Sequence, residues 1–125
     1  MNENELSKLV IGESIKVHSQ LGPGLLESLY EECVTFRLIK AGLRIEKQKP
    51  IPVIFDDVKL ECGFRCDLLV ENKLIIEIKA VETLNDIHLA QVLTYLKLTG
   101  VKLGLLMNFN VISLKDGIRR VVNKL

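Results

Sequence analysis

Two apolar segments joined by only three polar residues constrain the fold more than any other part of the sequence. Segment 63–70, GFRCDLLV, alternates apolar and polar side chains, and segment 74–80, LIIEIKA, is almost wholly apolar. Glu71, Asn72 and Lys73, which separate them, have the number and the chemistry of a tight hairpin loop with a left-handed residue. The two segments are therefore predicted to be neighbouring antiparallel strands.

The register of this hairpin follows from the need to bury its apolar side chains together. A two-residue loop would oppose the apolar set of one strand to the polar set of the other, whereas a three-residue loop gathers the apolar residues on one face. The predicted pairs are Val70 with Leu74, Leu68 with Ile76, and Cys66 with Ile78. Phe64, Cys66, Leu68 and Val70 then share one face of the sheet, and Arg65, Asp67 and Leu69 share the other.

The same register brings charged side chains together, because Asp67 falls opposite Glu77 and Arg65 falls opposite Lys79. Two facing carboxylates, with Cβ atoms about 5 Å apart, repel each other and destabilise the pair. A ladder of ion pairs with the two bases would offset this repulsion. A divalent cation such as Mg²⁺, shared by the carboxylates, would offset it better. The pattern therefore indicates either a metal site or a structural ladder.

Three features favour the metal site over the ladder. Ile75 and Leu69 make the charged face partly apolar, so the acids are expected to lie in a recess. Lys79 lies beside the acids on the same face, within reach of a phosphate or of a water molecule at the metal. Glu27 adds a further acid in the first turn of a helix, directly after the rigid Gly-Pro-Gly of residues 22–24.

Apolar periodicity, together with Gly and Pro, predicts the rest of the chain. One helix is expected over 5–20, ending at Gly22, and a second over 25–41. The apolar stripe of the second helix consists of Leu26, Leu29, Cys33 and Phe36. The remaining elements are an extended segment over 44–55, a turn at Asp56 and Asp57, a helix over 86–98 capped by Thr83 or Asn85, a buried strand over 101–109, and a short helix or strand over 113–122.

The helix over 86–98 has a polar stripe as well as an apolar one. His88, Gln91 and Tyr95 fall at positions i, i+3 and i+7, and therefore on one face. A substrate-contacting group is expected on such a stripe. A plain solvated face is the alternative, about as strong for His88 and weaker for Gln91.

Composition restricts the classes of function. A chain of 125 residues, 48% hydrophobic and 26% charged, is expected to form a single domain over 1–125. Its polar, acidic start and the lack of a long apolar run predict a cytoplasmic protein that does not span a membrane. The net charge of +1 excludes a strongly basic overall surface. The three cysteines are expected to be reduced thiols, and the spacing of Cys62 and Cys66 is weak evidence for zinc.

Two motifs connect this sequence to known proteins. Asp67, followed one hairpin later by the E-I-K of residues 77–79 and preceded by an acid on a helix, resembles the PD-(D/E)xK nuclease superfamily. More narrowly, GLLESLY, in which Gly24, Glu27 and Tyr30 fit G-x-x-E-x-x-Y, is similar to the GxxExxY family. The blocks VHSQLGPGLLESLYEE, FRCDLLVENKLIIEIKA, QVLTYLKLTG and LGLLMNF match in that order, so the likeness spans nearly the whole chain.

The resemblance implies an α/β fold with a restriction-endonuclease-like αβββαβ core, a mixed sheet flanked by helices, and an extra N-terminal helix. It also implies a Mg²⁺ or Mn²⁺ ion held by Asp67, Glu77 and Glu27. Lys79 would orient the attacking water or stabilise charge on the phosphate. The candidate catalytic residues are thus Lys79, Glu77, Asp67 and Glu27, and the candidate substrate contacts are Gln91, Tyr95, Arg65 and Tyr30. The proline of the superfamily's name is absent, since Cys66 stands before Asp67.

The function expected from this resemblance is metal-dependent hydrolysis of phosphodiester bonds in nucleic acid. The alternative is a non-catalytic module of the same fold that binds nucleic acid or a protein partner. The intact set of acids and lysine favours the enzyme, whereas the near-neutral charge favours the module. In a chain this small, an oligomer or a partner protein is expected to complete the binding surface, unless specificity is low.

Overall fold

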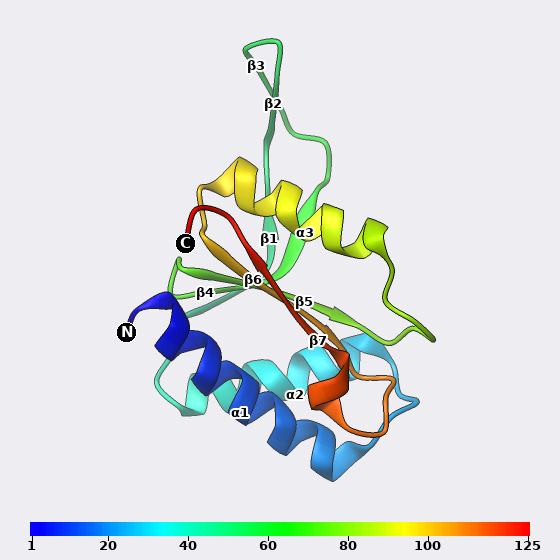
Figure 1. Cartoon of the computed structure of the whole chain (residues 1–125). Helices are drawn as coiled ribbons and strands as arrows, with labels where there is room; N and C mark the ends of the chain where they lie inside the picture. Colours follow the sequence, from blue (N-terminus) through cyan, green and yellow to red (C-terminus); the bar gives the residue numbers. More distant parts are fainter.

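The structure, a computed structural model, describes residues 1–125, and Figure 1 shows a central sheet with helices on both faces. The helices are α1 (Glu3–Leu21), α2 (Glu27–Lys40), α3 (Asp86–Thr99) and the short 3₁₀ helix η1 (Leu114–Gly117). The strands are β1 (Ile45–Pro50), β2 (Val53–Phe55), β3 (Val58–Leu60), β4 (Arg65–Val70), β5 (Leu74–Lys79), β6 (Leu103–Asn108) and β7 (Ile118–Val122). One apolar core lies between the sheet and α1 and α2, and a second lies between the sheet and α3.

The main sheet has five strands in the order β1-β4-β5-β6-β7. Only β5 and β6 are parallel neighbours, and α3 makes the crossover that such a pair requires. In chain order, α2, β1, β4, β5, α3 and β6 give the predicted αβββαβ arrangement, and α1 is the extra N-terminal helix. The predicted mixed α/β fold is confirmed. Beyond it, β7 adds an edge strand, and β2 and β3 form a separate hairpin that projects from the body (Figure 1).

The helices begin and end close to the predicted residues. The side chain of Asn2 caps α1 by accepting a hydrogen bond from the N–H of Glu5 (2.8 Å), and α1 ends at Gly22. Asn85, one of the two predicted caps, begins α3, and left-handed Gly100 ends it. Each observed limit lies within two residues of the predicted one. None of these helices combines the length and the apolar character that crossing a membrane requires.

The predicted hairpin register is confirmed next to the loop. Val70 pairs with Leu74 and Leu68 pairs with Ile76. Glu71 and Asn72 both adopt left-handed φ values, 52° and 54°, and the N–H of Lys73 donates to the carbonyl of Val70 (2.9 Å). A three-residue loop therefore connects β4 to β5.

Farther from the loop, the predicted pairing of Cys66 with Ile78 is wrong, because the β4–β5 ladder ends at Leu68. Leu68 belongs to the core under α1 and α2, whereas Cys66 belongs to the core under α3. In a regular strand two residues separated by one lie on the same face, so the alternation of β4 breaks at Asp67. The backbone at Asp67 is thus free to present its side chain in a direction that a regular ladder would not allow.

The predicted apolar stripe of α2 is also wrong. The residues that α2 buries are Tyr30, Val34, Thr35 and Leu38. Leu26, Leu29 and Phe36, which belong to the predicted stripe, remain 76%, 43% and 65% exposed. The helix carries two apolar stripes, and the position of the sheet decides which of them is buried.

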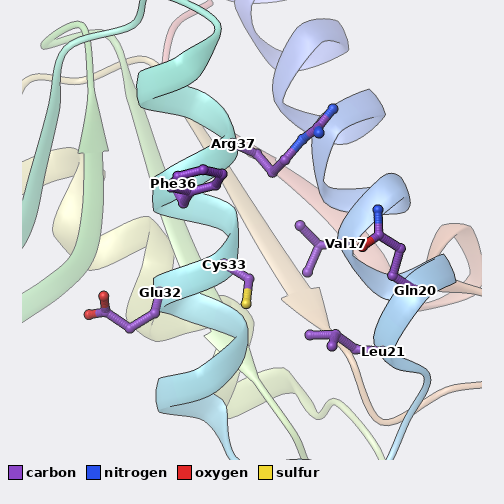
Figure 2. A pocket seen from close by; sticks show the side chains of 7 residues that line it. All are labelled: Val17, Gln20, Leu21, Glu32, Cys33, Phe36 and Arg37. Carbon is purple, nitrogen blue, oxygen red and sulfur yellow. The ribbon is translucent and has the colours of Figure 1, made fainter.

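Cys33 and Phe36, from the predicted stripe that the sheet does not cover, line a shallow pocket of about 290 Å³ between α2 and α1. Figure 2 shows Val17 and Leu21 of α1 on the side of the pocket that faces Cys33 of α2. At one end of the pocket, Arg37 forms an ion pair with Glu13 of α1 (2.8 Å). This ion pair joins the two helices on their outer side.

Ser14 offers a test of how tightly α1 is packed. Its hydroxyl is buried in the middle of the helix and has no hydrogen-bond partner. Ser14→Ala is expected to increase the free energy of unfolding by about 0.5 to 1 kcal/mol, because it removes an unsatisfied polar group and favours the helix. Ser7→Ala is the matched control, since the buried Ser7 hydroxyl donates to the carbonyl of Asn4 (3.0 Å) and its loss should destabilise. Urea midpoints that fall equally for both variants would contradict the prediction.

Candidate active site

Asp67 has no ladder partner in either of the two strands that flank β4. Towards β1, Leu68 and Cys66 are paired with Lys47 and Lys49, but Asp67 and Gln48 between them are not. The Asp67 carboxylate takes the place of a backbone partner, since its Oδ2 accepts a hydrogen bond from the N–H of Ile78 (2.8 Å). This bond places the carboxylate directly beside the end of β5.

Glu77 is the buried acid of the site, with only 3% of its surface exposed. Its Oε1 accepts a long hydrogen bond from the N–H of Asp67 (3.4 Å). Burial, and next the negative charge of Asp67, raise the pKa of Glu77 to about 9, against a smaller opposing effect of Lys79. Glu77 therefore keeps its proton to a higher pH than an exposed glutamate does.

The alternative to the metal site, a structural ladder of ion pairs, is not formed. The ion pairs of the chain join other residues, and none of them includes Asp67, Glu77, Arg65 or Lys79. Arg65 is exposed at the start of β4, and Lys79 is half-buried at the end of β5. The repulsion between buried Glu77 and half-buried Asp67 is therefore offset only in part, by the smaller effect of Lys79.

A pocket of about 280 Å³ opens on the α2 side of Asp67. It is lined by Glu27, Ser28, Glu31, Gln48, Asp67 and Ile78. Oε2 of Glu27 accepts a hydrogen bond from the N–H of Ala80 (3.0 Å), just beyond β5. Glu31 lies one helical turn after Glu27, and burial raises its pKa despite a hydrogen bond from Gln48 (2.7 Å). Three acids thus line one small recess.

On the opposite face, Tyr95 lies beneath Glu77 rather than on a solvated stripe. It is 4% exposed, and burial, followed by the charges of Glu77 and Asp67, raises its pKa to about 12. Its ring packs edge-on against Phe64, with centroids 5.9 Å apart. Gln91, one turn earlier, is half-buried. His88 forms the capping box of α3 with Asn85, so its place on the stripe has a structural reason.

Tyr30 is not brought into the pocket. It is fully buried, stacks on Phe109 with centroids 4.6 Å apart, and donates its hydroxyl hydrogen to the carbonyl of Gly22 (2.6 Å). The same hydroxyl accepts a hydrogen bond from the N–H of Leu25 (3.2 Å). Tyr30 therefore fixes the loop that leads into α2, and so the position of Glu27 at the start of that helix.

Three residues of the site region escaped the sequence reasoning: Glu31, Gln48 and Asn108. Glu31 could have been found, because it follows Glu27 by one helical turn. Asn108 gave a weaker signal as the polar residue within an otherwise apolar strand. It is buried at the end of β6 and binds Val81 twice, accepting from its N–H (3.0 Å) and donating to its carbonyl (2.9 Å). Asn108 thus fixes the chain immediately after Lys79.

The acids fit a hard divalent cation by their chemistry, since their carboxylates offer oxygen ligands and buried Glu77 lies beside half-buried Asp67 with only a small opposing effect of Lys79. The structure has no group of three or more His, Cys, Asp or Glu side chains placed to hold an ion. It therefore does not assemble the predicted set of Asp67, Glu77 and Glu27. Two carboxylates are nevertheless the usual protein contribution at a Mg²⁺ ion, which keeps water and substrate oxygens as its other ligands.

The mixed sheet, with acids and a lysine at the adjoining ends of β4 and β5, defines an α/β protein of the nuclease-like class. A model of the PD-(D/E)XK nuclease superfamily matches residues 4–121, so the chain belongs to this superfamily. Its fold is therefore restriction-endonuclease-like, and its function is nuclease-like with nucleic acid as the class of ligand. No curated protein and no solved structure matches the chain.

Proposed function

We propose that this protein is a metal-dependent nuclease that hydrolyses phosphodiester bonds, with Asp67, Glu77 and Lys79 as its catalytic residues. The observation that carries the proposal is the buried Glu77 carboxyl beside Asp67. Burial, and next the charge of Asp67, raise the pKa of this carboxyl to about 9. A structural role alone gives no reason to bury Glu77 beside the half-buried Asp67. A cation bound during function would give that reason.

Asp67 and Glu77 would hold the ion, Mg²⁺ or Mn²⁺, and the other ligands would be water and substrate oxygens. When bound, the ion would activate water as the nucleophile and neutralise charge on the phosphate. Glu27 and Glu31 line the recess from α2, where they would accept hydrogen bonds from water in the site. This arrangement would favour attack from the α2 side of the sheet.

Lys79 would supply the positive charge of the site. It follows Glu77 by two residues, and its segment is held by Asn108 and by Glu27. Its ammonium group would stabilise the negative charge that develops on the phosphate or orient the attacking water. Arg65 and Gln91 are the proposed contacts for the rest of the substrate, while Tyr95 would support Glu77 from below.

A non-catalytic module that binds nucleic acid or a protein is the second candidate. The specific observation in its favour is that no three acidic side chains converge on one point. The net charge of +1 also provides little general attraction for phosphates. In both proposals a second copy or a partner protein would supply part of the binding surface.

We propose that the chain belongs to the GxxExxY branch of its superfamily, and the role of each motif residue supports this proposal. Gly24 has a φ of 88°, which suits glycine alone. Glu27 binds the N–H of Ala80, and Tyr30 binds both ends of the loop before α2. The motif would therefore serve to attach the start of α2 to the end of β5.

The proposed nuclease is tested with plasmid DNA, single-stranded DNA and RNA, each with Mg²⁺, with Mn²⁺ or with a chelator. Cleavage is expected with either metal and not with the chelator. Asp67→Asn and Lys79→Ala should each reduce the rate by roughly 100-fold, because the first would weaken the hold on the ion and the second would remove the positive charge that stabilises the phosphate. Lys73→Ala is the matched control, since Lys73 precedes the same strand at its far end, and its rate should be unchanged.

Two outcomes would reject the nuclease. Cleavage that survives equally in Asp67→Asn and Lys79→Ala would place the activity elsewhere. Absence of cleavage, together with retained nucleic-acid binding in both variants, would favour the module. Calorimetric titration of the free protein with Mn²⁺ adds a test without substrate, because wild type should bind the ion and Asp67→Asn should bind it much more weakly.

A further inference from the structure

We propose that Gln48 is a positioning residue, which uses a left-handed turn of the backbone within β1 to hold Asp67 and Glu31 with one side-chain amide. The expected effect of Gln48 on catalysis rests on the proposed nuclease function. The effect of Gln48 on the geometry of Asp67 is independent of that function. The two effects can therefore be tested separately.

The backbone of β1 is unusual at Gln48. Its φ is 49°, a left-handed value that a long side chain rarely adopts outside a turn. The strand pairing has the same register on both sides, with Lys47 opposite Leu68 and Lys49 opposite Cys66, so no residue is inserted. Gln48 is exposed, and burial of its side chain does not account for the strain. The local conformation therefore calls for another reason.

The reason lies in what the side chain reaches from that conformation. Nε2 of Gln48 donates one hydrogen bond to Oε1 of Glu31 (2.7 Å) and one to Oδ1 of Asp67 (3.3 Å). The two N–H bonds of one amide thus join an acid on α2 to an acid on β4. Without this shared donor, two like charges that line the same pocket would move apart.

An amide is better suited to this position than a lysine or an arginine. A cationic side chain would also hold two carboxylates, but its charge would neutralise the negative charge that attracts a metal ion to the pocket. The neutral amide satisfies one oxygen of each acid and leaves the charge of the pocket in place. The position thus selects a donor without charge.

The contact also determines where the second oxygen of Asp67 points. With Oδ1 held by Gln48, Oδ2 accepts the hydrogen bond of Ile78 N–H (2.8 Å), next to Glu77. These hydrogen bonds therefore connect β1, β4 and β5 through Gln48, Asp67 and Ile78. They do so at the point where the β1–β4 and β4–β5 ladders have no backbone pairs. Residues that orient a ligand of a metal typically change affinity or activity by 10- to 100-fold when removed.

Three variants test the proposal. Gln48→Gly removes the amide and relieves the left-handed strain, while Gln48→Asn keeps the amide and tolerates the backbone but is one methylene too short. Asp57→Gly is the matched control, because Asp57 is also left-handed (φ 63°) but lies at the tip of the projecting hairpin. All three are expected to keep or raise the melting temperature, since glycine and asparagine suit this conformation.

The decisive measurement is hydrogen exchange of the Ile78 amide by NMR in metal-free protein. Exchange should accelerate at least about tenfold in Gln48→Gly and Gln48→Asn and stay unchanged in Asp57→Gly, with other amides of the sheet as the reference. The affinity for Mn²⁺, measured without substrate, and the cleavage rate should fall by about 10- to 100-fold in the same two variants.

Unchanged exchange at Ile78 in both Gln48 variants would overturn the proposal, whether or not the protein cleaves nucleic acid. Accelerated exchange with no cleavage by wild type would instead leave the role of Gln48 standing and reject the nuclease. Loss of folding in Gln48→Gly and Gln48→Asn, seen as a melting temperature below that of wild type while Asp57→Gly keeps its own, would assign Gln48 to the framework and also overturn the proposal.

Discussion

Raising the pH from 6 to 9 in the presence of a chelator is expected to destabilise this protein, because Glu77 must then carry its charge inside the fold. Burial and the neighbouring Asp67 raise the pKa of Glu77 from 4.5 to about 9. Between these two values the folded protein binds a proton that the unfolded chain has released. The contribution of Glu77 to the free energy of unfolding therefore falls across this window and is constant above it.

The expected fall between pH 6 and pH 9 is roughly 2 to 4 kcal/mol, since each pH unit within the window corresponds to about 1.4 kcal/mol for one proton. Glu77→Gln cannot ionise, so its stability should be nearly flat over this range and should exceed that of wild type at pH 9. Glu61→Gln is the matched control, because Glu61 is an exposed acid in the loop after β3.

The measurement is a series of urea unfolding curves at half-unit pH steps for the three proteins, with the chelator present throughout. Wild type and Glu61→Gln should follow the same falling curve. Parallel curves for wild type and Glu77→Gln would show that Glu77 is ionised at neutral pH without strain, and would remove the main support for the proposed metal site.

The part of this site that could be predicted from the sequence is the part that local pattern determines. The loop between Val70 and Leu74 has turn chemistry, and the alternation around it allows one register, so the proximity of Asp67 and Glu77 followed from the sequence. The limits of the helices followed from caps and glycines for the same reason.

The exact direction of the Asp67 side chain could not be predicted, because a neighbouring strand determines it. The alternation of β4 breaks beside left-handed Gln48 of β1. Pro50 and Pro52 indicate an edge-like or irregular segment near them, but nothing in the sequence points to residue 48 itself. The pairing of Cys66 with Ile78 failed at this break. Functional sites are where such departures from regular pattern are expected.

The face of α2 was likewise beyond local inference. Both of its stripes satisfy helical spacing, and only the arrangement of the sheet makes Tyr30 and Val34 the buried ones. The G-x-x-E-x-x-Y motif predicts Tyr30 as a substrate contact. Its hydroxyl is instead used within the loop before α2, which shows that a motif residue can act by positioning another residue, here Glu27.

Gly117→Ala is expected to be the most damaging substitution of a single small residue, with a loss of roughly 2 to 3 kcal/mol in the free energy of unfolding. A Cβ atom at this position would lie 2.2 Å from the carbonyl oxygen of Asn108 and 3.2 Å from Cγ2 of Val111. The φ of Gly117 is outside the left-handed region, so the clash alone causes the loss. Because the contact is with backbone, no side-chain rotation can relieve it.

The clash should also disturb the candidate active site, because Asn108 forms hydrogen bonds with Val81 and so fixes the segment that follows Lys79. Gly117→Ala is therefore expected to lower the urea midpoint and to weaken protection of the Val81 amide against hydrogen exchange. Gly12→Ala is the matched control, because its Cβ would meet no atom within 4 Å in the exposed middle of α1. That variant should gain about 0.5 to 1 kcal/mol from the helix preference of alanine. Equal midpoints for the two variants would mean that β6 and η1 can separate without loss, and that Asn108 does not depend on Gly117 for its place.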